Sequence, residues 1–214
     1  MLHGDPTQLD LAPRQRALIE LVQLVTTAPW SLSREHRVRW HVLDDGDLVH
    51  AVALSAYFGH LNRIADAVAV PLDYAVAIAA PPIDHARTPF ARAPRVVTTA
   101  AILELAHRPA TAAAIAAWRD YVLAKPEPLL PSMRAQIAAW NEGWLGAATP
   151  TDGDGELYRL VERVALAPWQ LDDDAFAPLR AHGWSEAALF DACATASSTN
   201  AWMRIDVALR ALAQ

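Results

Sequence analysis

The chain has 214 residues, of which 53% are hydrophobic, and this suits one compact domain or two small ones that share a core. A formal net charge of −6 without a stripe of Lys and Arg argues against nucleic acid as a partner. The lack of an uncharged apolar run of about 18 residues argues against a membrane-spanning helix, and the small number of glycines disfavours an all-β fold or a glycine-loop enzyme.

The first third of the chain has the pattern of three helices. Pro13 stands where a first helical turn tolerates proline, and apolar residues recur at helical spacing after it. Ser33 is a candidate N-cap for a short second helix, and Asp44 or Asp45 is one for a long third helix that stops before Pro71. The expected ranges are 14–27, 33–41 and 46–70.

The middle of the chain combines a proline-rich stretch with further helices. Four prolines lie within 75–94, and clustered proline prevents a continuous helix, so this stretch is expected to be a linker or surface crossing. Helices are then expected over 97–107, 111–123 and 131–145. A turn-rich segment over 151–155 leads into the last part of the chain.

Part of the beginning of the chain recurs near its end. Asp172 takes the capping place of Ser33, Ser185 takes that of Asp44 or Asp45, and a second long helix is expected from 186 to about 212. Such a repeat predicts two copies of one helical unit around a shared core, over 1–74 and 151–214, with 75–150 between them. No convincing strand is found, so the fold is predicted to be all-α. Leu21, Val22, Val25, Ala28, Pro29, Trp30 and Leu32 recur in order and spacing as Leu160, Val161, Val164, Ala167, Pro168, Trp169 and Leu171.

These residues are similar to a known family. Tyr57-Phe58 followed by Asn62-Arg63-x-Ala65-Asp66 and Val70-Pro71-Leu72-Asp73 resembles the C-terminal helix of the AhpD-like, peroxidase-related branch of the carboxymuconolactone decarboxylase superfamily. The resemblance covers roughly residues 12–74 and 154–212. It implies an AhpD-like helical bundle built from two copies of a three-helix unit, and assembly into homo-oligomers.

The chain departs from this family in its thiols. Peroxidase members carry a Cys-x-x-Cys pair, because one thiol attacks the peroxide and the other resolves the sulfenic acid. Here Cys193 is the sole cysteine, so the dithiol mechanism cannot operate within this chain. Cys193 has small apolar neighbours, which favours a packed thiol over a one-cysteine peroxidase. A single thiol also fits a reducing, cytoplasmic location.

Three residues of the long helix over 46–70 are the candidates for catalysis. At about 100° per residue, His50 and Tyr57 are nearly aligned, and His60 falls within about 80° of His50. Two imidazoles and a phenol could move protons on a small organic acid or lactone. The competing interpretation is a set of scattered polar residues at an oligomer surface.

Arg63 is better explained as a structural residue than as a substrate-binding one. Arg63 recurs as Arg204 in the second copy, which favours a structural ion pair, for example with Asp66, over the alternative of a clamp that binds the substrate carboxylate. No motif for a metal or a phosphate is found, so neither a metal nor a cofactor is expected.

Two functions therefore remain open. The first is an enzyme related to this superfamily that lacks the thiol pair and uses His50, Tyr57 and His60 for acid–base chemistry. The second is a catalytically silent member that binds a small apolar ligand or serves as a structural oligomer subunit. Fold analogy by itself supplies neither a substrate nor a pathway.

Overall fold

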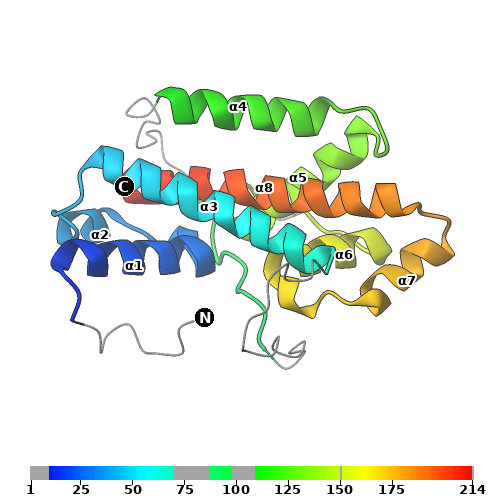
Figure 1. The fold of residues 1–214 in the computed structure, drawn as a ribbon, viewed down its shortest axis with the longest axis horizontal. Helices are drawn as coiled ribbons and strands as arrows, with labels where there is room; N and C mark the ends of the chain where they lie inside the picture. Colours follow the sequence, from blue (N-terminus) through cyan, green and yellow to red (C-terminus); the bar gives the residue numbers. More distant parts are fainter. Residues whose placement is uncertain (1–9, 70–86, 98–108, 150, 214) are drawn as a thin grey trace, which may run out of the picture.

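The fold is all-α, as the sequence predicts. The computed structural model describes residues 10–69, 87–97, 109–149 and 151–213, and over these residues it contains eight α-helices, two 3-10 turns and no strand (Figure 1). The helix predicted over 97–107 and most of the linker predicted over 75–94 lie outside the described residues.

The N-terminal part contains α1 (Pro13–Thr27), a 3-10 turn η2 (Pro29–Ser31), α2 (Arg34–Arg39) and α3 (Asp45–Ala67). Asp44 caps α3, because its Oδ1 accepts a hydrogen bond from the Asp47 amide at 2.7 Å. Ser33 precedes α2 as predicted, but its hydroxyl does not bond a backbone amide there. It lies instead 2.9 Å from Nδ1 of His36.

The C-terminal part contains α6 (Gly155–Leu166), a 3-10 turn η4 (Pro168–Gln170), α7 (Asp173–Ala181) and α8 (Glu186–Ala213). Both caps predicted here are present. Asp172 Oδ1 accepts a hydrogen bond from the Ala175 amide at 3.0 Å, and Ser185 Oγ accepts one from the Ala188 amide at 3.2 Å. Short polar side chains thus set where α7 and α8 begin.

Two helices connect these parts. They are α4 (Pro109–Ala124) and α5 (Pro131–Leu145), close to the predicted ranges 111–123 and 131–145. Both begin with proline, whose missing N–H costs nothing in a first turn. In Figure 1, α4 lies across the top of the molecule, above α3 and α8, while α5 packs directly against α8.

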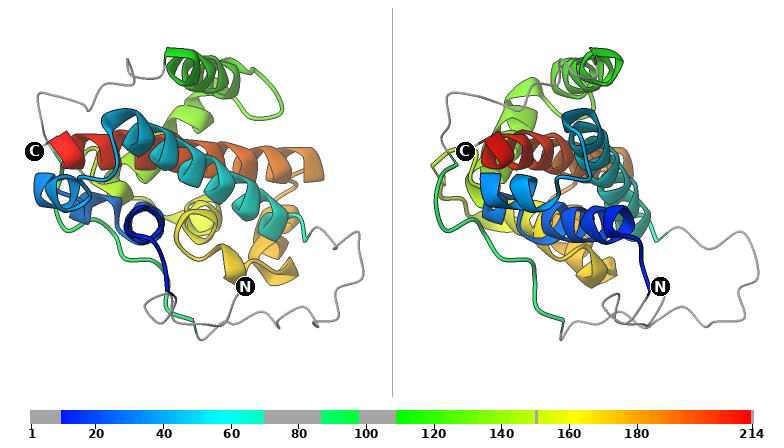
Figure 2. Two further views of the ribbon diagram at one scale, coloured as in Figure 1. Left: turned by 60° about the vertical axis from the view of Figure 1, so that its left-hand side comes forward. Right: turned by 90° about the vertical axis from the view of Figure 1, so that its left-hand side faces the viewer.

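Helix α8 forms the centre of the molecule. Twenty of its 28 residues are buried, and α3 runs antiparallel along it, from the end near α2 toward α7 (Figures 1 and 2). The C-terminal half of α8 packs with α1 and α3 in one apolar cluster, and its N-terminal half packs with α5, α6 and α7 in another. A helix that is surrounded on all sides must satisfy its polar side chains within the protein.

The two tryptophans of the 3-10 turns differ in burial. Trp30 in η2 is buried in the first apolar cluster. Trp169 in η4 is only partly buried, with its ring edge-to-face on Phe90 at 4.9 Å and the Arg87 guanidinium 3.9 Å from its ring centroid. The sequence repeat predicts equivalent positions in the chain, and the tertiary packing gives these two rings different neighbours.

Candidate functional site

The three predicted catalytic residues lie on α3 at different depths. His50 is exposed, Tyr57 is 46% exposed, and His60 is partly buried where α3 meets α8. Tyr57 and His60 are neighbours, with ring centroids 6.3 Å apart. The structure gives no contact between His50 and either ring. The site is therefore built around His60, with Tyr57 at its solvent-facing side.

Ser197 on α8 holds the imidazole of His60. Its Oγ lies 2.9 Å from Nδ1 of His60 and also donates to the backbone carbonyl of His60 at 2.9 Å. A hydroxyl has one proton, so when Ser197 donates it to the carbonyl it accepts a hydrogen bond from Nδ1–H. The neutral ring then carries its proton on Nδ1, and the lone pair of Nε2 accepts no hydrogen bond from the part of the chain that the structure describes.

Two tryptophans complete the surroundings of His60. The Trp118 ring on α4 lies 4.9 Å from His60, 6.0 Å from Tyr57 and 5.6 Å from Trp202 on α8. These edge-to-face and tilted contacts are the geometries that aromatic pairs prefer. We call Tyr57, His60, Trp118, Ser197 and Trp202 the His60 cluster.

Sequence reasoning missed three members of this cluster. Trp118 lies in a helix that has no catalytic motif, and Ser197 and Trp202 lie within an alanine- and serine-rich stretch of α8. Ser197 meets His60 because α3 packs along α8, and Trp118 joins them because α4 lies above α3 and α8. No local signal in the sequence indicates that crossing.

The environment makes His60 a weak base. The pKa of His60 is lowered from its usual 6.5 to about 4, first by burial and then by the nearby Arg63 guanidinium, while the hydrogen bond with Ser197 acts in the opposite direction. The ring is therefore neutral at pH 7. A neutral imidazole with a free Nε2 can accept a hydrogen bond or a proton from a bound molecule.

Arg63, the candidate for substrate binding, is buried and bonded to backbone. Its Nη1 donates to the Gly59 carbonyl at 2.9 Å, and its Nε and Nη2 reach the Ala165 carbonyl of α6 at 3.4 and 3.3 Å. The pKa of Arg63 is lowered to about 10, because the effect of burial exceeds the opposing effect of the Asp66 charge. These contacts link α3 to α6, which is a structural role.

Cys193, on α8, has the properties of a packed thiol. Its side chain is 1% exposed, and burial raises the pKa of the thiol to about 12. The nucleophilic form of cysteine is the thiolate, which is scarce at neutral pH when the pKa is so high. Thiol chemistry at Cys193 is therefore disfavoured in the folded chain.

A cavity of about 360 Å³ adjoins the His60 cluster between α4, α5 and α8. Trp202 lines it together with Ile115, Met203 and Leu209, while Arg119 and Glu142 bring charge to its wall. None of the three predicted catalytic residues lines this cavity. Trp202 is thus the member of the His60 cluster that also lines the cavity, and its ring contacts that of Trp118.

Three further findings concern metal binding, membrane helices and related proteins. Within the described residues, no group of three or more His, Cys, Asp or Glu side chains is arranged to hold a metal ion, and none of the described helices combines the length and apolar character needed to cross a membrane. No family model, curated protein or solved structure matches the chain.

Proposed function

We propose that this chain is an AhpD-like protein, related to the carboxymuconolactone decarboxylase superfamily, that performs acid–base chemistry on a small organic acid or lactone without dithiol peroxidase activity. The single observation that carries the chemistry is the neutral His60 held by Ser197 between aromatic rings. The family assignment derives from the sequence resemblance over 12–74 and 154–212.

The proposed architecture is a duplicated three-helix unit. Supporting it, the order helix, 3-10 turn, short helix, long helix occurs as α1, η2, α2, α3 and again as α6, η4, α7, α8. The 3-10 turns Pro29–Ser31 and Pro168–Gln170 stand at matching places in the sequence repeat. The two long helices pack antiparallel on one another, as two copies around a shared core would.

In the proposed chemistry His60 accepts a proton. Nε2 takes it from the acidic position of the bound acid or lactone, and the Tyr57 hydroxyl donates a hydrogen bond to the oxygen where negative charge develops. A carboxylate that binds beside His60 raises the pKa of the ring, because opposite charge favours the imidazolium. Substrate binding would thus turn a weak base into a stronger one.

A second candidate is a catalytically silent protein that binds a small ligand or serves as a structural oligomer subunit. The exposure of His50 and Tyr57 and the packed state of Cys193 favour it. In that case His60 is a buried neutral residue whose hydrogen bond to Ser197 fastens α3 to α8.

We also propose that the chain forms homo-oligomers in the cytoplasm. Leu54, Phe58 and Leu61 of α3 and Val68 at its C-cap are all more than 40% exposed, and they follow one another at spacings of four, three and seven residues. Such a stripe is typical of a helix that packs against another helix. Sedimentation equilibrium of the purified chain, compared with the Phe58→Glu variant, tests this part of the proposal.

The catalytic proposal is tested with a panel of small lactones and organic acids, followed by proton release or uptake. We expect His60→Ala, alone or with His50→Ala, to abolish turnover while the folded state persists in thermal denaturation. Ser197→Ala should reduce turnover by about tenfold, since the ring loses its orientation. Unchanged turnover in the His50/His60 double variant would contradict the proposal and leave the silent candidate.

A further inference from the structure

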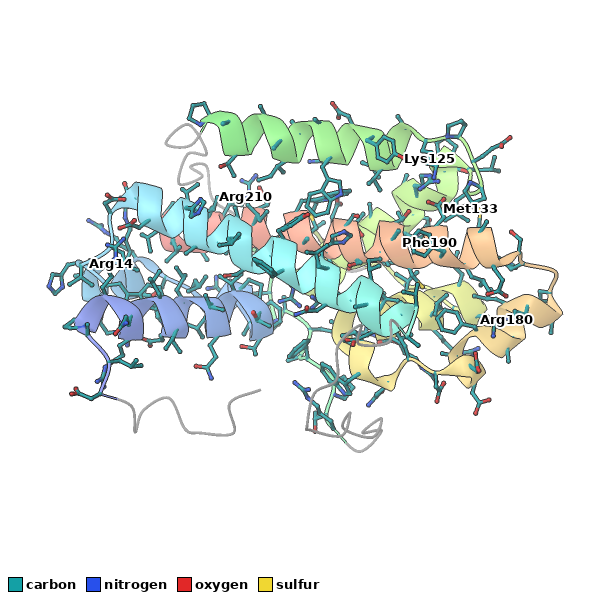
Figure 3. The ribbon with its side chains drawn as sticks, in the orientation of Figure 1. Arg14, Lys125, Met133, Arg180, Phe190 and Arg210 are labelled. Atoms are coloured by element: carbon teal, nitrogen blue, oxygen red, sulfur yellow. The ribbon has the colours of Figure 1, made fainter. Side chains whose placement is uncertain are left out.

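A second cavity lies on the other side of the molecule from α4. It has a volume of about 580 Å³ and is bounded by the C-terminal end of α3, by α7 and by the first turns of α8. Figure 3 shows Phe190 of α8 and Arg180 of α7 beside this end of α3. No member of the His60 cluster lines it. We call it the α3–α7–α8 cavity.

The inner lining of this cavity is apolar. Leu171, Phe176, Leu189 and Cys193 are all less than 9% exposed and line it together. At its edge, Phe190 is 50% exposed. A concave apolar surface of this volume is in the range of sites that take small organic molecules.

The charged lining of the cavity is mostly acidic. Among the described residues that line it are four carboxylates and one cation, Arg180. Two of the carboxylates, those of Asp173 and Glu186, pair with Arg180, and a third, Asp172, caps α7. The fourth carboxylate, that of Asp66, is exposed and accepts no side-chain hydrogen bond from a described residue. Arg63 and Arg87 act on Asp66 from nearby, and the carboxylates still outnumber the cations when both are included.

An apolar interior beside an acidic rim selects one chemical class of ligand. The exposed Asp66 carboxylate at the edge of the apolar cavity offers a charged acceptor for a cationic head group. The exposed Phe190 ring adds a face on which an ammonium group can be stabilised. An anionic ligand would meet like charge at the rim, and that juxtaposition is costly.

We propose that the α3–α7–α8 cavity binds an organic monocation with an apolar body, such as an alkylammonium ion. The ammonium group lies beside Asp66 and Phe190, and the hydrocarbon chain lies against Leu171, Phe176 and Leu189. This site is independent of the acid–base chemistry proposed at His60, which takes a ligand of the opposite charge.

The test compares three probes with the same chain and different head groups: hexylammonium, hexan-1-ol and hexanoate. Binding to the full chain is followed by methyl NMR of labelled leucine and valine residues and by calorimetry. We expect hexylammonium to bind about tenfold or more tightly than the other two. We expect it to shift the methyl signals of Leu171 and Leu189, while those of Leu54, which lies on the outer side of α3, stay in place.

Two variants locate the head group. Asp66→Asn should weaken hexylammonium binding by about tenfold and remove the preference over hexanol, whereas Asp120→Asn, an exposed position on α4, should change neither. Phe190→Ala should weaken binding with Asp66 intact, and Tyr121→Ala, at an exposed aromatic position on α4, is its control. Equal affinity for the three probes, methyl shifts away from the cavity, no binding of hexylammonium at millimolar concentration, or unchanged binding in Asp66→Asn overturns the proposal. Loss of turnover at His60 has no bearing on any of these outcomes.

Discussion

Arg63 and Arg204 make the same kind of contact from two antiparallel helices. Arg63 of α3 donates to the carbonyl of Ala165 near the end of α6, and Arg204 of α8 donates to the carbonyls of Val25 and Thr26 near the end of α1, at 2.9 and 2.6 Å. Both guanidinium groups are buried. Each long helix thus uses one arginine to hold the first helix of the other half of the chain, where the last carbonyls lack helical partners.

Removal of Arg204 should destabilise the fold strongly. Its guanidinium also bonds Asn200 Oδ1 at 2.7 Å, so truncation leaves several buried acceptors without a donor. We expect Arg204→Met to lower the free energy of unfolding by about 2–4 kcal/mol in urea denaturation. The exposed Arg119→Met serves as control, with an expected change within about 0.5 kcal/mol. Equal effects of the two substitutions would show that the carbonyl contacts contribute little.

The buried ion pair between Arg134 of α5 and Asp191 of α8 offers a second stability test. Arg134 Nη1 also donates to Thr195 at 2.9 Å, and both charged side chains are buried. Asp191→Asn leaves a buried guanidinium without its counter-ion, so we expect a loss of about 3–5 kcal/mol. Replacement of both partners by apolar residues, Arg134→Met with Asp191→Leu, should recover part of that loss.

An ion pair on the surface of α6 serves as the control for the buried pair. Arg159 and Glu156 pair at 2.7 Å on α6, and the Arg159 side chain is 61% exposed. Glu156→Gln should cost no more than about 1 kcal/mol, because solvent screens exposed pairs. The buried-pair interpretation fails when Asp191→Asn costs no more than Glu156→Gln.

Protonation of His60 should couple stability to pH. The folded-state pKa of about 4 lies below the usual 6.5, so between these values the unfolded chain binds more protons than the folded chain. Stability should therefore rise from pH 4 to pH 6.5 and level off above. Because the ring is only partly buried, we expect its share to be on the order of 1–2 kcal/mol.

The pH dependence is measured by urea denaturation at several pH values. In His60→Asn the free energy of unfolding should rise less steeply between pH 4 and pH 6.5 than in the parent chain. His50→Asn, at an exposed position of the same helix, should show the same pH dependence as the parent chain. Identical slopes in all three proteins would mean that His60 titrates normally in the folded state.

Trp118 should control the electrostatics of His60. The indole ring covers the imidazole at 4.9 Å, so Trp118→Ala admits water and should raise the pKa of His60 toward 6.5. NMR titration of the His60 ring proton measures this shift, and we expect a loss of stability of about 2 kcal/mol to accompany it. The control is Tyr121→Ala, 68% exposed on the same helix. A pKa that stays near 4 without Trp118 would assign the burial of His60 to α8 alone.

Local signals in the sequence predicted the helices well. Proline at the start of α1 and α5, and short polar side chains before α3, α7 and α8, define helix ends through the backbone groups of a single turn. The predicted cap Ser33 differs, since its hydroxyl is next to the His36 ring. Whether the Ser33 hydroxyl caps α2 therefore depends on a neighbouring side chain as well as on the backbone.

The candidate site was predicted less well from the sequence than the helices were. Helical spacing places His50, Tyr57 and His60 along one side of α3, yet the depth of each residue depends on what covers it. Trp118 and Ser197, far away in the chain, bury His60, and the structure brings neither of them to His50. The chemical difference between two histidines ten residues apart is therefore a property of packing.

The sequence by itself determined the all-α character, the ends of most helices and the lack of a thiol pair, because each depends on residue identity within a turn or two of the chain. Only the tertiary structure decided that His60 is neutral, that Arg63 and Arg204 bond distant carbonyls, and that a cavity with an acidic rim opens beside Cys193. Burial and long-range hydrogen bonds arise when helices far apart in sequence cross, and local periodicity carries no information about which ones do.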